Sequence, residues 1–362
     1  MDTGKRNVQL SRAGQKKLAD SLLSENGPGL GKRLGEELVC QALHALHLLQ
    51  RDRDYLVHEN KIHIIDANTG RTMPDRSWER SLHQFVEAKE GCPFTQTREQ
   101  LGRLTYQRFF GRYLGLAGMT GTAREVRSEL WSVYGLKVCQ IPLHRPSRRR
   151  ELPTRIFSGV EVKWTAVITQ VKKLQNQGRP VLIGTGSLAD SEVLSLKLTL
   201  ANITHQVLNA RQDKAEAAIV ANAGQKGQVT VATNMAGRGT DIPLAHGVSK
   251  LGGLHVIATC RNQARRIDRQ LFGRCARQGD PGSHQAILSL EDELVSQNCH
   301  PAMRRFLIRF TIKEQGIINR LNLYIMRHAQ KGLERRYCQA RRALLKHDRQ
   351  TDQLLAFSGC ME

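Results

Sequence analysis

The stretch "PVLIGTGSLADSEVLSLKLTLA" (residues 180–201) decides the fold class of this chain. It opens with a short run of Val, Leu and Ile, turns at the glycines of "GTGS" (184–187), and continues as a helical segment. A strand without polar alternation is buried on both of its faces, as in a parallel sheet that helices cover on both sides. The stretch therefore predicts one strand–helix unit of an α/β domain.

The same alternation of strand and helix extends to Leu290. The strand-like segments "HQVLNA", "QVTVATN", "LHVIATC" and "SHQAILSL" follow in turn, with "DKAEAAIVANAG" and "NQARRIDRQLFGR" as helical segments among them. Helices between parallel strands form right-handed crossovers, so the pattern predicts a parallel, doubly wound sheet. Ligands bind such sheets beyond the carboxyl ends of the strands, where "GTGS" and "TNMAGRGTD" (233–241) lie.

The segments around this domain have simpler patterns. Residues 8–52 are predicted to form two helices, 54–71 a β-hairpin with its turn at "HENK", and 78–115 a mainly helical region. "IPLHRPSRRRELP" (141–153), with three prolines, is the best candidate for a linker. After Glu293 the chain is predicted to be helical and basic to its end.

Composition limits the classes of function. The 362 residues suffice for two or three domains, no apolar run approaches the ~20 residues that span a bilayer, and the eight cysteines form no CxxC pair. These features favour a soluble protein with free thiols in a reducing cytosol, without structural zinc or disulfides. The net charge of +22 attracts polyanions. Residues 301–350 alone hold thirteen Lys and Arg against three Asp and Glu, which form either a solvated helix face or a surface for acidic lipid or nucleic acid.

Two motifs contain candidate binding chemistry. In "DRQLFGRCARQGDPG", Arg274 and Arg277 are three residues apart, on one face of a helical turn or of the loop that leaves it, and their planar charged groups suit phosphate oxygens. In "NMAGRGTD", the glycines let backbone N–H groups approach an anion, while Arg238 and Asp241 supply a cation and an acceptor for a ribose or a metal shell. Taken alone, the first motif is also compatible with a surface cluster that contacts carboxylates, and the second with an ordinary turn.

Five motifs together resemble a known family. They are "GLAGMTGTA" (115–123), "PVLIGTGS" (180–187), "TVATNMAGRGTDI" (230–242), "GGLHVIAT" (252–259) and "RIDRQLFGRCARQGDPGS" (266–283). In this order they resemble the motor motifs of SecA, the bacterial preprotein translocase ATPase family, which is a superfamily 2 helicase-like motor. The resemblance is collinear from about residue 2 to about residue 352.

The flanking segments extend the resemblance and imply the domain organisation. "RDRDYLVHENKIHIIDANTGRTM" (51–73) and "LHQFVEAKEG" (82–91) resemble the return of the preprotein-crosslinking domain into the first motor domain, and "AQKGLERRYCQARRALLKHD" (329–348) resembles the start of the helical scaffold domain. The implied fold is a RecA-like motor domain with a small α+β N-terminal part and a helical C-terminal stub. Its parts are a remnant of the crosslinking domain (1–72), a C-terminal piece of the first motor domain (73–123), a complete second motor domain (124–295) and a basic scaffold stub (296–362).

The resemblance also implies the roles of individual residues. Arg274 and Arg277 resemble arginine fingers, which reach a nucleotide held by the first motor domain and stabilise charge on the transferred phosphoryl group. Thr120, Gly121 and Thr122 are implied to couple the nucleotide state to domain closure, and no residue is assigned to a metal ion. The implied nucleotide-binding residues are Gly237, Arg238, Gly239, Thr240, Asp241, Gln270, Gly273 and Gln278.

The chain departs from the family pattern in one large respect. The family's P-loop and DExD-type strand end belong to the first half of the first motor domain, and that half would precede Met1. "GPGLGKRL" (27–34) is a decoy, because Asn26 replaces the first P-loop glycine and Arg33 replaces the Mg²⁺-binding Ser or Thr. "AILSLEDEL" (286–294) imitates a strand that ends in acids, but it matches the last strand of the second motor domain and not a Mg²⁺ site.

Smaller departures concern the arginine loop and the ends of the resemblance. Cys275 and Ala276 stand where the family usually has Ser and Gly, and because both are small we expect the geometry of the arginines to be retained. The scaffold helix stops early, and the two-helix finger, wing and zinc-binding tail have no counterpart in this sequence. The net charge also differs, because the family is usually acidic whereas this chain is strongly basic.

The expected function is that of a SecA-like component of ATP-driven protein translocation across the bacterial cytoplasmic membrane. We expect that the chain alone does not hydrolyse ATP. ATP and Mg²⁺ are expected to bind only when a separate chain that contains the P-loop half completes the site. Whether this chain is itself an enzyme stays open. Further partners implied by resemblance are a SecYEG-like translocon and unfolded preproteins, in the cytoplasm or at the inner face of the cytoplasmic membrane.

Two alternatives remain. One is a non-catalytic adaptor or decayed fragment that binds anionic lipid and protein through the basic C-terminal region. The other is a superfamily 2 protein that binds nucleic acid, which the positive charge suits. The crosslinking-like segment at 51–91 counts against the second alternative, because helicases have no reason to contain it.

Overall fold

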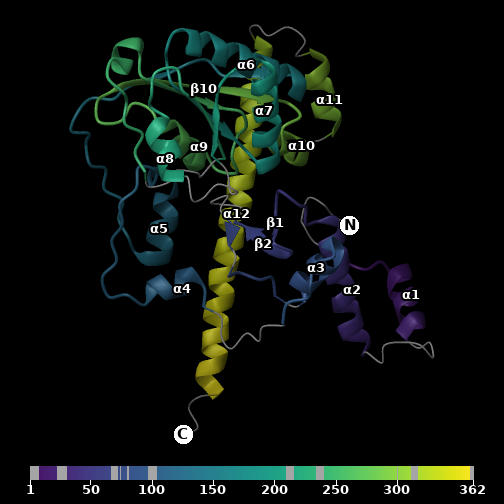
Figure 1. Cartoon of the computed structure of the whole chain (residues 1–362). Helices are drawn as coiled ribbons and strands as arrows, with labels where there is room; N and C mark the ends of the chain where they lie inside the picture. Colours follow the sequence, from purple (N-terminus) through teal and green to yellow (C-terminus); the bar gives the residue numbers. More distant parts are fainter. Residues whose placement is uncertain are drawn as a thin grey trace.

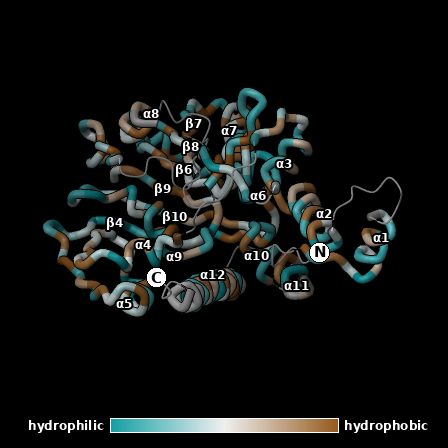
Figure 2. The backbone as a smooth tube through the Cα atoms, turned by 90° about the horizontal axis from the view of Figure 1, so that it is seen from below, coloured by the Kyte–Doolittle hydropathy of each residue, from teal (hydrophilic) through white to brown (hydrophobic). Residues whose placement is uncertain are grey.

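One long helix, α12, projects from a large α/β domain and lies between two smaller groups of elements (Figure 1). The N-terminal helices α1–α3 lie on one side of α12, and the short helices α4 and α5 lie on the other, in both views (Figures 1 and 2). The computed structural model describes residues 8–22, 31–66, 72–73, 75–79, 81–96, 104–208, 216–233, 240–299, 301–310 and 317–358.

The α/β domain is built on a parallel sheet in the order β4-β10-β9-β6-β8-β7, and β5 also pairs with β10. The stretch at 180–201 forms β6 and the helix α7 that follows it. The predicted parallel α/β fold of the RecA-like class is thus confirmed. The strands are β4 (Arg148–Glu151), β5 (Arg155–Phe157), β6 (Val181–Thr185), β7 (Gln206–Leu208), β8 (Val229–Thr233), β9 (Leu254–Ala258) and β10 (Pro281–Ser289).

Each face of this sheet forms its own hydrophobic core. Because side chains alternate along a strand, Leu182 and Val256 enter one core while Ile183 and Ile257 enter the other. Helices α6 (Val160–Asn176) and α7 (Leu188–Leu200) pack on the second core. The first core is covered by α8 (Glu216–Asn222), α9 (Arg265–Phe272), α10 (Glu293–Asn298) and α12 (Ile317–Ser358).

A glycine in β6 allows α9 to lie close to the sheet. A Cβ atom placed on Gly184 would be 2.4 Å from a methyl carbon of Leu271, so a side chain there would displace the Leu271 side chain. Leu271 and Phe272, the last residues of α9, are both buried in the first core. The packing of α9 against the sheet therefore includes the contact of Leu271 with Gly184.

The acids that follow β10 are structural. Asp292 accepts a hydrogen bond from Nζ of Lys163 at 2.7 Å, and both side chains are buried. Glu291 accepts a hydrogen bond from the backbone N–H of Val160 at 3.0 Å. These acids join the end of β10 to the start of α6, and neither lines the cavity described below.

The N-terminal part contains the predicted helices and hairpin, α1 (Arg12–Leu22), α2 (Lys32–His47), β1 (Tyr55–His58) and β2 (Lys61–Ile65). Glu59 and Asn60 both have positive φ, as the type I′ turn of a two-residue hairpin requires. A third strand, β3 (Thr72–Met73), pairs with β2. The prediction of a mainly helical region over 78–115 was only partly right, because α3 (Leu82–Glu90) and α4 (Tyr106–Gly111) are its helices and residues 92–96 are not helical.

The predicted linker at 141–153 is partly wrong. Residues 148–151 form β4, which pairs with β10 at the edge of the sheet, so only the residues before it connect α5 (Arg127–Tyr134) to the domain without regular structure. The C-terminal region is helical as predicted, with α10, α11 (Pro301–Phe310) and α12. Within the described parts of the chain, no helix is both long and apolar enough to cross a membrane.

Candidate functional site: an arginine-lined cavity

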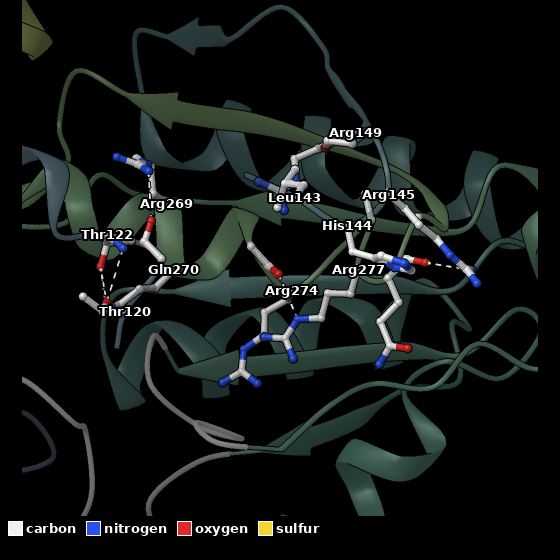
Figure 3. Close-up of a pocket in the computed structure, with 16 residues that line it drawn as sticks. Thr120, Thr122, Leu143, His144, Arg145, Arg149, Arg269, Gln270, Arg274 and Arg277 are labelled. Carbon is white, nitrogen blue, oxygen red and sulfur yellow. Dashed lines mark hydrogen bonds between the residues drawn. The ribbon is translucent and has the colours of Figure 1, made fainter. Parts of the chain in front are cut away.

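An arginine-lined cavity of about 840 Å³ lies where three segments meet: the C-terminal end of α9 with its loop, residues 120–122, and the segment that leads into β4 (Figure 3). Its lining includes five arginines and one histidine, and no Asp, Glu or Lys is among the described residues that line it. The cationic and polar lining residues are Thr120, Thr122, His144, Arg145, Ser147, Arg149, Arg269, Gln270, Arg274, Arg277 and Gln278.

Helix α9 is fixed at its N-terminal end by a buried network. Asp268 is 3% exposed and accepts hydrogen bonds from the backbone N–H of Asn262 at 2.9 Å and from its side-chain amide at 2.8 Å. Gln330 of α12 donates to Asp268 at 2.9 Å and to the carbonyl of Asn262 at 2.9 Å. A buried carboxylate satisfied by several donors holds its neighbours in one geometry, so α12 helps to set the position of α9.

Both predicted arginine fingers are bonded to protein oxygens in this structure. Arg274 donates from Nη1 to the carbonyl of Thr240 at 2.9 Å. Arg277 donates from Nη1 to Oδ1 of Asp241 at 2.8 Å and from Nε to the carbonyl of Gly273 at 3.0 Å. The spacing of three residues thus brings both guanidinium groups to the same short loop after β8.

Several other predicted residues join this cluster. Gln278 donates to Oδ2 of Asp241 at 3.3 Å, so Asp241 holds two residues of the arginine loop at once. Gln270 and Gly273 line the cavity with the arginines. The predicted nucleotide-binding residues Gly237, Arg238 and Gly239 lie outside the described residues, and so do residues 27–30 of the P-loop-like decoy.

The loop between α9 and β10 has an unusual backbone. Ala276 (φ 56°), Gln278 (φ 51°) and Gly279 (φ 85°) are all in the left-handed region, which costs a residue with a Cβ about 1–2 kcal/mol. Cys275 is buried, and burial raises the pKa of its thiol, so it is a small packing residue rather than a nucleophile. The substitution of Ala for the family's usual glycine therefore coincides with a strained position at 276.

The predicted coupling residues contact α9 directly. Gln270 donates to Oγ1 of Thr122 at 3.3 Å, and Arg269 donates from Nη2 to the carbonyl of Gly121 at 3.0 Å. Thr122 is buried, and its hydroxyl lies 3.2 Å from that of Thr120. Residues 120–122 are thus hydrogen-bonded to the helix that precedes the arginine loop.

Arg269 is partly neutralised by a second contact. It forms an ion pair with Glu125, next to the coupling residues. Burial by itself raises the pKa of Glu125, but the hydrogen bond from Arg269, a backbone hydrogen bond and the charges of Arg269 and Arg265 together outweigh burial, and the pKa lies below its ordinary value. The net positive charge of the cavity therefore comes mainly from Arg145, Arg149 and Arg274, because Arg277 is also ion-paired, with Asp241.

Three cavity arginines were missed from the sequence: Arg145, Arg149 and Arg269. Arg145 and Arg149 lie in the run "HRPSRRRE" of the predicted linker, whose density of positive charge is the sequence signal that points to them. Arg269 lies five residues before Arg274. Among the described residues, no group of three or more His, Cys, Asp or Glu side chains is arranged to hold a metal ion.

The fold and the site together define a RecA-like α/β domain with an arginine-lined cavity at its edge. Comparison with protein families matches residues 146–249 and 245–315 to the SecA P-loop domain, and residues 1–87 to the SecA preprotein cross-linking domain. This chain belongs to the SecA family. The first matched domain is named for a P-loop, yet no G-x-x-x-x-G-K-[S/T] sequence occurs within its matched residues.

Named relatives agree with this assignment. The chain is 47% identical to protein translocase subunit SecA 2 of Nitrosospira multiformis, over 97% of this chain and 53% of that protein. It is 45% identical to protein translocase subunit SecA 3 of Magnetococcus marinus, over 99% of this chain and 55% of that protein. The chain thus spans about half the length of the curated relatives it matches.

Solved structures give a weaker likeness. The E. coli DEAD-box protein SrmB is 19% identical, with a TM-score of 0.33 over 42% of this chain and 83% of that chain. At that score the likeness adds nothing to the sheet topology described above.

Proposed function

We propose that this chain supplies the arginine-bearing half of a SecA-type motor that uses ATP to move proteins across the bacterial cytoplasmic membrane. The observation that supports this function best is the arginine-lined cavity, because Arg274 and Arg277 enter it from one loop. Planar guanidinium groups bind phosphate oxygens with two parallel hydrogen bonds. Arginines that reach a γ-phosphate from a second domain accelerate phosphoryl transfer by about 10³–10⁵.

The chain alone is proposed not to hydrolyse ATP. Motors of this class hold the β- and γ-phosphates with a P-loop Lys and hold Mg²⁺ with a Ser or Thr and an acid. None of the described residues that line the cavity is Lys, Asp or Glu. ATP and Mg²⁺ would therefore bind productively only when a P-loop-bearing half, in a separate chain or in further sequence of this one, closes over the arginines.

An exposed aromatic face on α4 and the residues that follow it is suited to receive that half. Four ring side chains at 106–113 contact one another, and Tyr106 remains 81% exposed. Met119, next to the coupling residues, is 98% exposed. A cluster of exposed aromatic side chains of this kind marks a protein interaction site. The residues of the aromatic face are Tyr106, Phe109, Phe110, Tyr113, Leu114 and Met119.

The remaining partners follow from the family. We propose a SecYEG-like translocon and unfolded preproteins as partners of the assembled motor, which would act at the inner face of the cytoplasmic membrane. The match of residues 1–87 to the preprotein cross-linking domain supports contact with preproteins.

Binding of tripolyphosphate and ATP to the purified chain tests the proposal. We expect weak, Mg²⁺-independent binding that Arg274→Gln reduces, and no ATP turnover. Asp241→Asn should strengthen binding several-fold, because it releases Arg277 from its ion pair. ATP turnover by the chain alone, abolished by Arg274→Gln, would contradict the need for a second half. Co-expression with a P-loop-bearing SecA half should give a complex with ATPase activity, and the absence of both would refute the split motor.

A second candidate function is binding to an anionic lipid surface. Helix α12 projects beyond the α/β domain (Figure 1). Cosedimentation with phosphatidylserine vesicles that is lost at high salt and is indifferent to ATP would favour this adaptor function over the motor. The exposed basic residues of the projecting part are Arg335, Arg336, Arg342, Lys346 and Arg349.

A further inference from the structure

The arginine loop needs an external support to keep its shape. Between α9 and β10, Ala276 and Gln278 are both held at positive φ, which a residue with a Cβ rarely adopts. Backbone strain of this kind persists only where the surrounding structure imposes it. The support must therefore come from groups that bond the loop from outside.

Two arginines from the segment before β5 provide such bonds. Arg149 donates to the carbonyl of Cys275 from Nε at 3.3 Å and from Nη2 at 3.1 Å. Arg145 donates from Nη1 to the carbonyl of Gln278 at 3.5 Å and packs against Gly279. Each of these two carbonyls lies directly beside a strained residue, so the contacts are placed where the backbone is under most strain.

The register of the sheet brings Arg149 to this place. β4 pairs with β10 so that Arg149 lies opposite Gly282. A Cβ atom on Gly282 would be 2.6 Å from the backbone nitrogen of Ala276, so the loop folds back tightly over the strand at this glycine. Arg149 reaches across the same point to the carbonyl of Cys275.

We propose that Arg149, assisted by Arg145, is a positioning residue that holds the loop with Arg274 and Arg277 in its strained, phosphate-facing conformation. The role of that conformation in phosphate binding rests on the proposed function. The hydrogen bonds that hold the loop form without any ligand. Because residues 145–149 follow directly on the segment that joins α5 to the sheet, a movement of that segment changes the support and so the presentation of the arginines.

Limited trypsin digestion of the full chain, followed by mass spectrometry, tests the support without a ligand. Arg149→Gln should accelerate cleavage after Arg274 by about fivefold, the effect of losing two hydrogen bonds from a charged donor at an exposed edge. Arg149→Lys keeps the charge but cannot donate both hydrogen bonds to the carbonyl of Cys275, so it should also accelerate cleavage.

Arg150→Gln is the matched control, because it removes the same charge from the same strand and none of these hydrogen bonds. Cleavage after Lys172 in α6 reports on the integrity of the domain and should be unchanged in all variants. Equal acceleration in Arg149→Gln and Arg150→Gln, no acceleration in Arg149→Gln, or a parallel rise at Lys172 would overturn the proposal.

Calorimetric titration with tripolyphosphate separates this proposal from the function on which it rests. If the native chain binds tripolyphosphate, Arg149→Gln should weaken binding about fivefold and Arg150→Gln much less. Unchanged affinity in Arg149→Gln would refute the positioning role. If the native chain does not bind tripolyphosphate, the proposed function fails, while the digestion still decides whether Arg149 supports the loop.

Discussion

Replacing Ala276 with glycine should stabilise the α/β domain, although glycine usually destabilises folded proteins. Ala276 has a φ of 56°, a conformation that costs an L-residue about 1–2 kcal/mol and costs glycine almost nothing. Glycine loses more backbone entropy on folding, which offsets about 0.5–1 kcal/mol of this gain. The expected net effect is a free energy of unfolding raised by about 0.5–1 kcal/mol, or a melting temperature raised by about 1–4 °C.

Urea denaturation followed by tryptophan fluorescence measures this effect. Trp164 is 2% exposed in the core between α6 and the sheet, so its emission reports on unfolding of the same domain. Ala189→Gly is the control of opposite sign, because Ala189 is exposed within α7 and should lose about 1 kcal/mol on replacement. If Ala276→Gly destabilises the domain as much as Ala189→Gly does, the left-handed strain inferred for the arginine loop is wrong.

Further outcomes follow from three ion pairs. Lys163→Met should lower the free energy of unfolding by about 3–5 kcal/mol, because it leaves the buried Asp292 without its cationic partner. The double variant Lys163→Met/Asp292→Leu removes both charges, and urea denaturation should show that it recovers most of this loss. A double variant as unstable as the single one would contradict this explanation. Lys197→Met, which removes an exposed pair, should cost less than about 1 kcal/mol. The hydrogen bonds from Arg341 lower the pKa of Glu129, so the α5–α12 contact is stable above the ordinary value of 4.5 and is lost as pH falls through the lowered pKa. Glu129→Gln should therefore lower the melting temperature at pH 7, with a difference from the native chain that shrinks below pH 4.5; a difference independent of pH would exclude a role for the charge.

Much of the fold was predictable because its signals are local. Strands such as 181–185 are apolar on both faces, and the glycines, caps and helical spacing that follow them lie within a few residues. The hairpin turn at 59–60 was predictable for the same reason. The interruption of the helical region after Glu90 follows from Gly91, whose left-handed conformation caps α3, and this local signal was overlooked. The entry of 148–151 into the sheet depends on pairing with the distant strand β10 and was not predicted.

The sequence by itself determined the class of the sheet, the family to which the chain belongs, and the presence of Arg274 and Arg277 on one turn. These depend on periodicity, motif order and spacing, which are properties of the linear sequence. Only the tertiary structure decided that Asp241 holds Arg277, that Arg149 holds the carbonyl of Cys275, and that Ala276 is left-handed. The physical reason is that these contacts join residues 36 and 126 positions apart, which a parallel sheet with crossover helices brings together at its edge.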